Sequence, residues 1–509
     1  MARWPVVAAA ALVLAPCSTA YAGGYVGASA SGLDRAVAAG RLSELEASEY
    51  RRALAQARAA AAVSSASSAT LAPVLRDAAA LAYAYDSPRA LALFSTVRMN
   101  TRYAVRGGLP RADVRDDDGI VYRPFPGRGL RFHPLASFGA LNAHAENGRY
   151  RRAIRLAYAL LARGRPQGAG LVWESYFGWA GGTPPWTSGM TQAVAAQAFA
   201  RVGLVEEARL AYRALADGLL VNLSAGPWVR IYHFNAAAVL NAQLQTAVSV
   251  AEYARLTGDA AAAQLARRLR EAAKTLLPRF DTYFWSRYSL GGPEAELKYH
   301  QYVTSLLWRL GARTGDPYWG RWAARFRDYW RKPPALERRY RPAPVYPLPR
   351  DGFRDDAVIR FWLSKPATVT LRIAGTVRTL YLQPGVRQLT WSPGNRPPGR
   401  YAVRLTAVDR VGNRLTRTFR PVVVARDTTP PRLRARIAGG ELRWRARDAG
   451  TPWLRLRVVL YRPGERRVLD LRRQPLVGRV RVPAGRGWGA AVVAADSSRN
   501  PRLLLLAPG

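Results

Sequence analysis

Cysteine is almost absent from this sequence of 509 residues, whose single cysteine is Cys17. Arg3 is followed by an apolar stretch, Val6 to Leu14, and then by the small-residue triplet Ala20-Tyr21-Ala22. This pattern is typical of an export signal that is cleaved after the triplet. Cleavage there would remove Cys17, so the expected mature chain has no disulfide, no thiol nucleophile and no cysteine metal site. No later apolar run is long enough to cross a bilayer. We therefore expect a protein that is secreted or held at the cell surface without a transmembrane anchor.

Acidic residues and lysines are also scarce. The chain has 77 basic residues against 34 acidic ones, a net charge of +43. Only four of the basic residues are lysines, which leaves 73 arginines. The codon bias of a GC-rich genome accounts for arginine in place of lysine, but not for so few acids. A positive field of this size favours polyanions. Because export argues against genomic nucleic acid, an acidic polysaccharide is the expected partner.

Sequence motifs for metal or cofactor chemistry are missing. The four histidines are scattered, and there is no H-E-x-x-H, C-x-x-C, Walker loop, G-x-S-x-G or dinucleotide fingerprint. We expect no metal and no cofactor. The turn Asp116-x-Asp118-Gly119 lacks the remaining ligands of a calcium loop and is expected to close a hairpin. Four acids near the long loops leave hydrolysis by paired carboxylates open. They are Glu174, Asp281, Glu294 and Glu296.

A helical repeat occupies the middle of the chain. Gly148, Gly203, Gly258 and Gly315 end helical stretches at intervals of 55, 55 and 57 residues, and each is followed at once by another helix. A period of this length predicts one antiparallel helix pair per repeat. Either an open solenoid or a closed α/α toroid would satisfy it. The connections within repeats, such as 165–188, are long and rich in Trp, Gly and Pro, which favours a toroid with its loops gathered on one functional face.

After Pro333-Pro334 the hydrophobic period changes from helical to two, which predicts β-strands. The segment Asp409-x-x-x-Asn413 is echoed by Asp496-x-x-x-Asn500, indicating two tandem Ig-like or fibronectin-like sandwiches. The fold class is therefore a multidomain one, an all-α toroid followed by two all-β modules. The predicted segments are a signal peptide (1–22), an N-terminal helical region (23–115), the toroid with the catalytic site (116–335), a Pro/Arg-rich linker (336–349) and two sandwiches (350–426 and 427–509).

Tyrosines beside arginines are the remaining candidates for chemistry. Tyr288 follows Arg287, and Tyr232 lies close to Arg230. An adjacent cation would lower the pKa of a phenol and let it act as a base. Such a base suits proton abstraction from a carbon next to a carboxylate, and the arginines would stabilise the resulting enolate. The alternative is that these tyrosines are ordinary core residues.

Residues of about 120–332 resemble the C-terminal domain of D-glucuronyl C5-epimerases, which convert glucuronate to iduronate in heparan-type polysaccharides. The resemblance rests on four segments in order. They are Pro185-Trp-Thr-Ser188-Gly-Met190-Thr-Gln192, Val239-Leu-Asn241-Ala-Gln-Leu244, Tyr288-Ser-Leu290 and Tyr299-His300. It implies an α/α toroid whose active-site tyrosines are Tyr232, Tyr288 and Tyr299. The family's Glu before the first tyrosine is Ile231 here, and the Asp-Leu-Arg after the second is Ser289-Leu290-Gly291.

The resemblance implies a secreted uronate-polysaccharide C5-epimerase in which Tyr288 and Tyr299 move the C5 proton and Tyr232 assists. The residues expected to bind substrate are Arg230, Arg287, His300, Trp186, Gln192, Asn241 and Trp173. Two other functions stay open at this point. One is a lyase, because the same intermediate can expel the 4-O substituent, and the other is an inactive glycan-binding protein of the cell surface. The β modules are expected to be spacers or contacts to glycan or cell wall.

Overall fold

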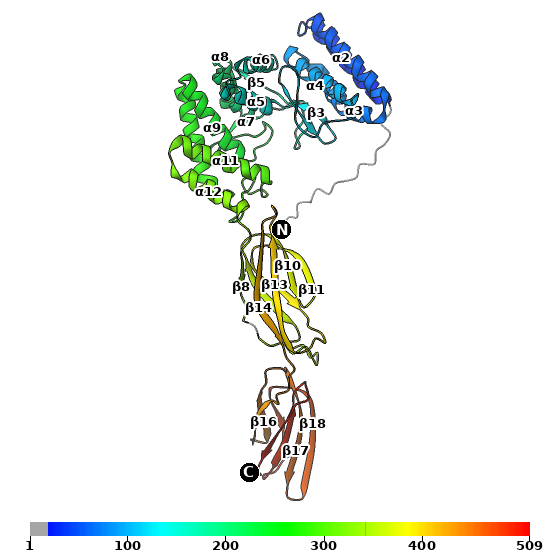
Figure 1. The fold of residues 1–509 in the computed structure, drawn as a ribbon, viewed down its shortest axis with the longest axis vertical. Coiled ribbons are helices and arrows are strands. Elements are labelled where there is room, and N and C mark those ends of the chain that lie inside the picture. The colour runs from blue at the N-terminus through cyan, green and yellow to red at the C-terminus, as the bar shows by residue number, and fades with distance from the viewer. Residues whose placement is uncertain (1–18, 342, 509) are drawn as a thin grey trace. The chain divides into compact units, whose positions relative to one another are not determined.

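The computed structural model describes residues 19–341 and 343–508 (Figure 1). The chain divides into a helical unit that runs through Arg327 and a β unit that starts at Asp328. Most of the predicted export signal, residues 1–18, lies outside the described residues. Among the described helices, none is long and apolar enough to cross a membrane.

Four helices open the helical unit. They are α1 (Thr19–Ala38), α2 (Glu44–Val63), α3 (Ser65–Ala80) and α4 (Ser87–Ala104), with a short 3-10 turn η1 (Ala82–Ala84) before the last. Helices α1 and α2 are separate, because Ser43 and Glu46 make a capping box that starts α2. Ser64 and Asp86 cap α3 and α4 through their side-chain oxygens, so the serine-rich stretch 64–68 begins a helix.

A small antiparallel sheet connects these helices to the repeats. Its strands are β1 (Val114–Arg115), β2 (Val121–Phe125) and β3 (Gly129–Phe132). The predicted turn at Asp116 is confirmed, since its Oδ1 accepts a hydrogen bond from the amide of Ile120 at 2.9 Å. Buried Asn100 of α4 donates to the carbonyl of Leu130 and accepts from its amide, both at 2.8 Å. This pair of bonds holds β3 against α4.

Four helix pairs follow, as the repeat predicted. They are α5 (Pro134–Glu146) with α6 (Tyr150–Leu161), α7 (Gly189–Arg201) with α8 (Val205–Gly218), α9 (Leu240–Thr257) with α10 (Ala260–Leu276), and α11 (Leu297–Thr314) with α12 (Pro317–Arg331). The four repeat glycines all have positive φ, between 66° and 83°, where a Cβ would be strained. Figure 1 shows the pairs following one another around a curve.

The pairs form two layers. Helices α5, α7, α9 and α11 pack on one another in that order, and α6, α8 and α10 pack against α5, α7 and α9. Almost every residue of α7 and α9 is buried, whereas α8 and α10 bury only one stripe. The α/α arrangement and the β modules below confirm the predicted multidomain fold class.

Each long connection ends where the next inner helix begins. The connection before α7 contains the hairpin β4 (Arg165–Gln167) and β5 (Gly170–Val172), and the one before α9 contains β6 (Leu220–Leu223) and β7 (Gly226–Val229). The connection before α11 starts with the 3-10 turn η2 (Leu277–Phe280). The loops therefore gather at the amino-terminal ends of the inner helices.

The β unit contains two seven-stranded sandwiches with the same strand order. The first has sheets β11-β10-β13-β14 and β12-β9-β8, and the second has β18-β17-β20-β21 and β15-β16-β19. The first module's strands are β8 (Leu336–Arg338), β9 (Ala357–Leu363), β10 (Ala367–Ile373), β11 (Thr376–Leu382), β12 (Gly385–Trp391), β13 (Gly399–Val408) and β14 (Arg414–Val424). The second module's strands are β15 (Arg432–Ala438), β16 (Glu441–Arg447), β17 (Trp453–Arg462), β18 (Glu465–Pro475), β19 (Val477–Arg481), β20 (Gly489–Ala495) and β21 (Pro501–Leu506). Each module has its own hydrophobic core.

The Asp-to-Asn echo in the sequence is a turn that both modules share. Asp409 accepts hydrogen bonds from the backbone and side-chain amides of Asn413, and Asp496 does the same with Asn500. In the first module, Lys365 from the loop between β9 and β10 lies 2.6 Å from the Asp409 carboxylate. In the second module, the equivalent loop between β16 and β17 carries Asp448 instead.

Replacing Lys365 by Met should destabilise the β unit by about 3–5 kcal/mol at neutral pH, because it leaves the Asp409 carboxylate buried without its cation. Urea unfolding of the full chain measures this change. Lys332→Met is the matched control, since that side chain is 71% exposed and should change stability by only about 0.5 kcal/mol. Equal effects of the two substitutions would contradict the structural role given to Lys365.

Candidate active site

A cavity of about 740 Å³ lies in the helical unit against the four inner helices. Each inner helix contributes one stripe of residues that are three, four or seven positions apart. The stripes are Leu135, Gly139, Asn142 and Glu146 on α5; Met190, Val194, Gln197 and Arg201 on α7; Asn241, Gln245 and Val248 on α9; and Tyr299, Tyr302, Arg309 and Arg313 on α11. On α5, α7 and α11 these stripes run from the first to the last turn of the helix, so the cavity follows the helix axes.

The loop end of the cavity is aromatic. Trp186 packs edge-on against Tyr232 with ring centroids 4.9 Å apart, and Tyr232 stacks on Phe234 at 5.4 Å. The indole of Trp179 donates a hydrogen bond of 2.9 Å to the Tyr232 hydroxyl. Predicted site residues Trp186 and Tyr232 therefore line the cavity, and so does Asn241 at the start of α9.

Three tyrosines meet at this end. Tyr288, from the loop before α11, contacts Tyr299 in the first turn of α11, with ring centroids 5.1 Å apart. Burial raises the pKa of Tyr288, and ionisation of Tyr232 or Tyr299 would raise it further. Burial also raises the pKa of Tyr232. A negative charge on Tyr299 would therefore favour the protonated forms of Tyr288 and Tyr232.

The expectation that Arg287 and Arg230 lower these pKa values is wrong. Arg287 donates to the carbonyl of Gly292 at 2.8 Å, and Arg230 faces the carbonyl of His233 at 3.4 Å. Neither arginine is among the described residues that line the cavity. Each arginine is close to a tyrosine in the sequence. In the folded chain, however, each arginine side chain points to a backbone carbonyl instead.

The cation beside the tyrosines is Arg123 of β2, which the sequence did not single out. The hydrogen-bonded carboxylate of Asp113, 2.7 Å away, raises the pKa of Arg123, and Tyr299 adds to this effect. The guanidinium also lies 2.9 Å from Nε2 of His133. Arg123 comes from a strand far earlier in the sequence, so only the tertiary fold brings it to Tyr299.

His133 connects Arg123 to the start of α5. Its Nδ1 accepts a hydrogen bond of 3.1 Å from the amide of Ala136 and so caps the helix. Burial, and then the charge of Arg123, lowers the pKa of His133 to about 4. The imidazole is consequently neutral at physiological pH and does not repel a positively charged neighbour.

Three residues that the resemblance placed at the substrate lie elsewhere. His300 is fully buried, with Nε2 donating to the carbonyl of Phe326 at 2.8 Å, Nδ1 2.7 Å from the Ser286 hydroxyl, and its ring stacked on Trp285. Trp173 is a core residue whose indole donates to the carbonyl of Leu160. Gln192 is also fully buried. This corrects the prediction that these side chains contact substrate: His300 fixes the Tyr288 loop to α11.

The candidate carboxylates do not form a hydrolytic pair. Glu174 is buried in an ion pair of 2.9 Å with Arg89 of α4, and Asp281 lies 2.7 Å from Arg325. Glu146, at the far end of α5, is the one acid among the described lining residues. Hydrolysis by two carboxylates flanking a glycosidic bond has no counterpart in this cavity.

A hydrogen-bonded chain of buried polar groups forms the floor of the cavity. The hydroxyl of Tyr302 donates to Gln245, whose amide donates to Ser249, whose hydroxyl donates to Gln197. Gln197 in turn donates to Glu252 of α9 at 3.0 Å. Such a satisfied network holds its side chains in one arrangement, which gives the cavity a fixed shape.

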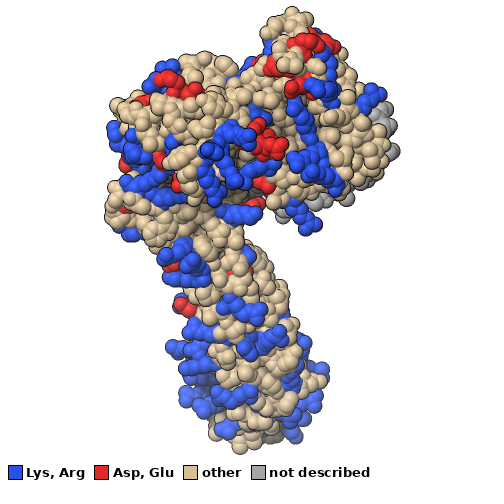
Figure 2. All heavy atoms as spheres, turned by 45° about the horizontal axis from the view of Figure 1, so that its top comes forward, with Lys and Arg blue, Asp and Glu red and all other residues tan. Residues whose placement is uncertain are grey.

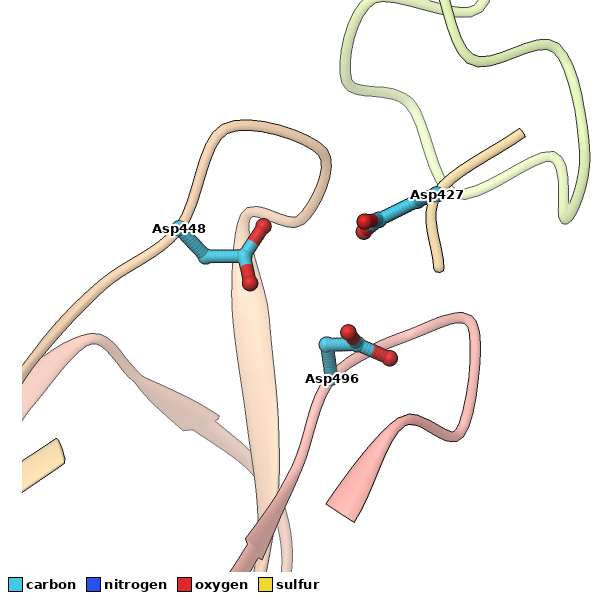
Figure 3. Close-up of side chains that lie close together, drawn as sticks. All are labelled: Asp427, Asp448 and Asp496. Carbon is cyan, nitrogen blue, oxygen red and sulfur yellow. The ribbon is translucent and has the colours of Figure 1, made fainter. Parts of the chain in front are cut away.

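Three carboxylates of the β unit could hold a cation. Oxygens of Asp427, Asp448 and Asp496 lie within 4.8 Å of one another, and Figure 3 shows the three side chains converging from separate loops. Carboxylate oxygens suit hard cations such as Ca²⁺. Burial, with the neighbouring carboxylates adding to it, raises the pKa of Asp427 and of Asp448. An acidic cluster alone does not define a cation site.

Asp448→Asn should make the β unit more stable at pH 7, because the folded-state pKa of this carboxyl lies above its unfolded value. The gain should vanish below about pH 4, where the carboxyl is protonated in both states. Thermal unfolding of the full chain in EDTA from pH 3.5 to 8 measures it.

Asp470→Asn is the control for Asp448→Asn and should change stability in the opposite direction. The ion pair with Arg455 lowers the pKa of Asp470, so removing that carboxylate should cost stability at pH 7 and nothing at acid pH. If both variants moved the melting temperature in the same direction, the pKa assignments would be refuted.

Comparison with known proteins agrees with the resemblance seen in the sequence. Residues 170–328 match the family described as "D-glucuronyl C5-epimerase C-terminus". This segment contains Tyr232, Tyr288 and Tyr299, whereas Arg123 and His133 lie before it. No curated protein matches the chain.

Solved structures with a similar fold include several carbohydrate-active proteins. A D-mannose isomerase is 15% identical over 40% of this chain and 59% of its own, with a TM-score of 0.31. A GH76 α-mannanase of Bacteroides thetaiotaomicron is 13% identical over 38% and 60%, with a TM-score of 0.30. An endo-β-1,4-glucanase of Acetobacter xylinum is 11% identical over 38% and 67%, with a TM-score of 0.29. The chain spans about three fifths of the first two, and similarity at this level says nothing about activity.

Proposed function

We propose that this protein is a carbohydrate-modifying isomerase that inverts C5 of uronate units in an acidic polysaccharide, because residues 170–328 match the D-glucuronyl C5-epimerase C-terminal family. The observation that carries the proposal is the meeting of Tyr232, Tyr288 and Tyr299 beside Arg123 at one end of a large cavity. The export-signal pattern supports placing this reaction outside the cell.

The chemistry begins with removal of the C5 proton. A tyrosine oxygen takes the proton, and the electrons of the C5–H bond move into the adjacent carboxylate to give an enolate-like intermediate. A second tyrosine then donates its proton to the opposite face of C5. The base starts as a phenolate and ends as a phenol, the acid does the reverse, and proton exchange with solvent restores both; no oxidant or reductant is needed.

Tyr299 is the best candidate for the group that accepts the proton. It is 41% exposed in the cavity and lies within electrostatic reach of the Arg123 guanidinium, which stabilises negative charge nearby. Tyr288 and Tyr232 have raised pKa values and stay protonated, so they are suited to donate.

Arg123 is the residue proposed to bind the uronate carboxylate. A guanidinium can bind a carboxylate through two parallel hydrogen bonds and would stabilise the enolate as charge moves onto that group. The ion pair with Asp113 and the contact with His133 hold Arg123 in place before substrate arrives. This assignment replaces Arg230 and Arg287, whose side chains bind backbone carbonyls.

Replacing Tyr299 by Phe should lower turnover at least about 100-fold with little effect on folding, because only the proton-transfer oxygen is removed. The assay is an NMR time course in D₂O with heparosan, a glucuronate polymer. Deuterium should enter C5 as iduronate signals grow. Growth of 4,5-unsaturated signals would establish a lyase, and unchanged turnover in the variant would exclude Tyr299 as the base.

Arg123→Gln should raise KM and lower kcat together, since Arg123 is proposed to hold the carboxylate in both the bound substrate and the transition state. Arg287→Gln is the matched control, because the sequence had suggested Arg287 for the same role. It should change kcat/KM by no more than about threefold. A larger loss of kcat/KM in Arg287→Gln than in Arg123→Gln would show that Arg287, and not Arg123, binds the carboxylate.

A further inference from the structure

The outer face of one sheet in the second β module is covered with arginine. Strands β15, β16 and β19 alternate buried and exposed residues, and eight exposed positions on this face are arginines. They are Arg432, Arg434, Arg436, Arg443, Arg445, Arg447, Arg479 and Arg481. We call this surface the arginine face.

The strand register places these arginines directly opposite one another. Arg434 faces Arg445, Arg432 faces Arg447, and Arg443 faces Arg436 on one side and Arg479 on the other. Like charges in directly opposed positions destabilise an antiparallel sheet. Among the described residues, Glu441 is the one acid that pairs with this face, and it contacts Arg443 and Arg479. The side chains of the remaining six arginines make no ion pair or hydrogen bond within the described part of the chain.

Codon bias does not explain this arrangement, because the first module has an equivalent sheet without it. The face of β12-β9-β8 exposes Val358 and Arg360 on β9, and the residue opposite Arg360 is Gln388. The opposite sheet of the second module also carries arginines, but two acids pair with three of them: Asp470 with Arg455, and Glu465 with Arg462 and Arg467. Figure 2 shows basic residues far in excess of acidic ones on the visible surface of the β unit.

We infer that the arginine face binds a linear acidic polysaccharide and so holds the enzyme on its polymer. The arginines form rows roughly 7 Å apart along the strands and about 5 Å apart across them. This regular positive surface, about 14 Å long, complements a chain that carries a carboxylate or sulfate on successive sugars. Guanidinium groups suit such anions because each can donate two parallel hydrogen bonds. The choice of a polysaccharide as the partner rests on the proposed function.

The test compares two charge-matched variants of the full chain. Arg434, Arg436 and Arg445 are changed to Gln in one, and Arg151, Arg152 and Arg213 on outer helices α6 and α8 in the other. All six side chains are exposed and make no ion pair or hydrogen bond within the described residues. Binding to immobilised heparosan is measured from 50 to 300 mM NaCl, with double-stranded DNA as the competing polyanion.

The first variant should bind heparosan roughly tenfold more weakly, and the slope of log affinity against log salt should fall by about two or three, whereas the second should bind as the parent does. The melting temperature of the first variant should not fall, since its substitutions remove like charges that face one another across the strands. Equal weakening of binding in both variants would overturn the inference, because binding would then depend only on the net charge of the protein and not on the arginine face. DNA binding as tight as heparosan binding, and equally lost in the first variant, would also overturn it.

Turnover separates this inference from the proposed reaction. On short uronate oligosaccharides the first variant should keep the parent's kcat, while on long polymer its KM should rise. A protein that binds heparosan through the arginine face but shows no C5 exchange would refute the proposed reaction and leave the binding site standing. Normal turnover with undiminished binding in the first variant would refute the binding site and leave the reaction standing.

Discussion

One buried carboxylate ties the four inner helices together. Glu252 of α9 accepts hydrogen bonds from Gln197 and Arg201 of α7 and pairs with Arg313 of α11, and Arg201 also pairs with Glu146 of α5. Burial alone would raise the pKa of Glu252, but the two arginines hold it below its usual value. The carboxylate is therefore charged at neutral pH and keeps α5, α7, α9 and α11 in one arrangement. Removing it would leave Arg313 without its carboxylate partner at the base of the cavity and Arg201 with Glu146 alone.

This constraint explains how a helical array can have a cavity at its centre. An array with an apolar interior would close around its axis, since buried apolar surface is gained by contact. Here the inner faces carry amides, hydroxyls and charged groups that satisfy one another and leave space between them. The tyrosines occupy the opposite end of the same helices, so the network that shapes the floor also fixes the distance to the reacting end.

Much of the fold could be predicted from local signals in the sequence. The glycines at intervals of about 55 residues mark real helix ends because each needs positive φ, and the Asp-to-Asn echo marks a turn that closes on itself. Tyr232, Tyr288 and Tyr299 were found through short motifs and do meet in space. The residues that were misplaced depend on tertiary contacts. His300 lies within one of the motifs and Trp173 in the long connection before α7, yet their ring nitrogens donate to backbone carbonyls in the interior. Arg123 belongs to no motif and reaches Tyr299 only because a small sheet packs at the start of α5.

The position of the loops has an electrostatic consequence. His133, Ser188, Asn241 and Tyr299 sit at or next to the first turns of α5, α7, α9 and α11, and all four line the same cavity. Four helix amino termini, each with a partial positive charge from its aligned peptide dipoles, therefore surround the tyrosine end. A negative charge that forms there, on a phenolate or on a substrate carboxylate, is stabilised by the backbone itself. The fold would supply this field even if every side chain in the cavity were neutral.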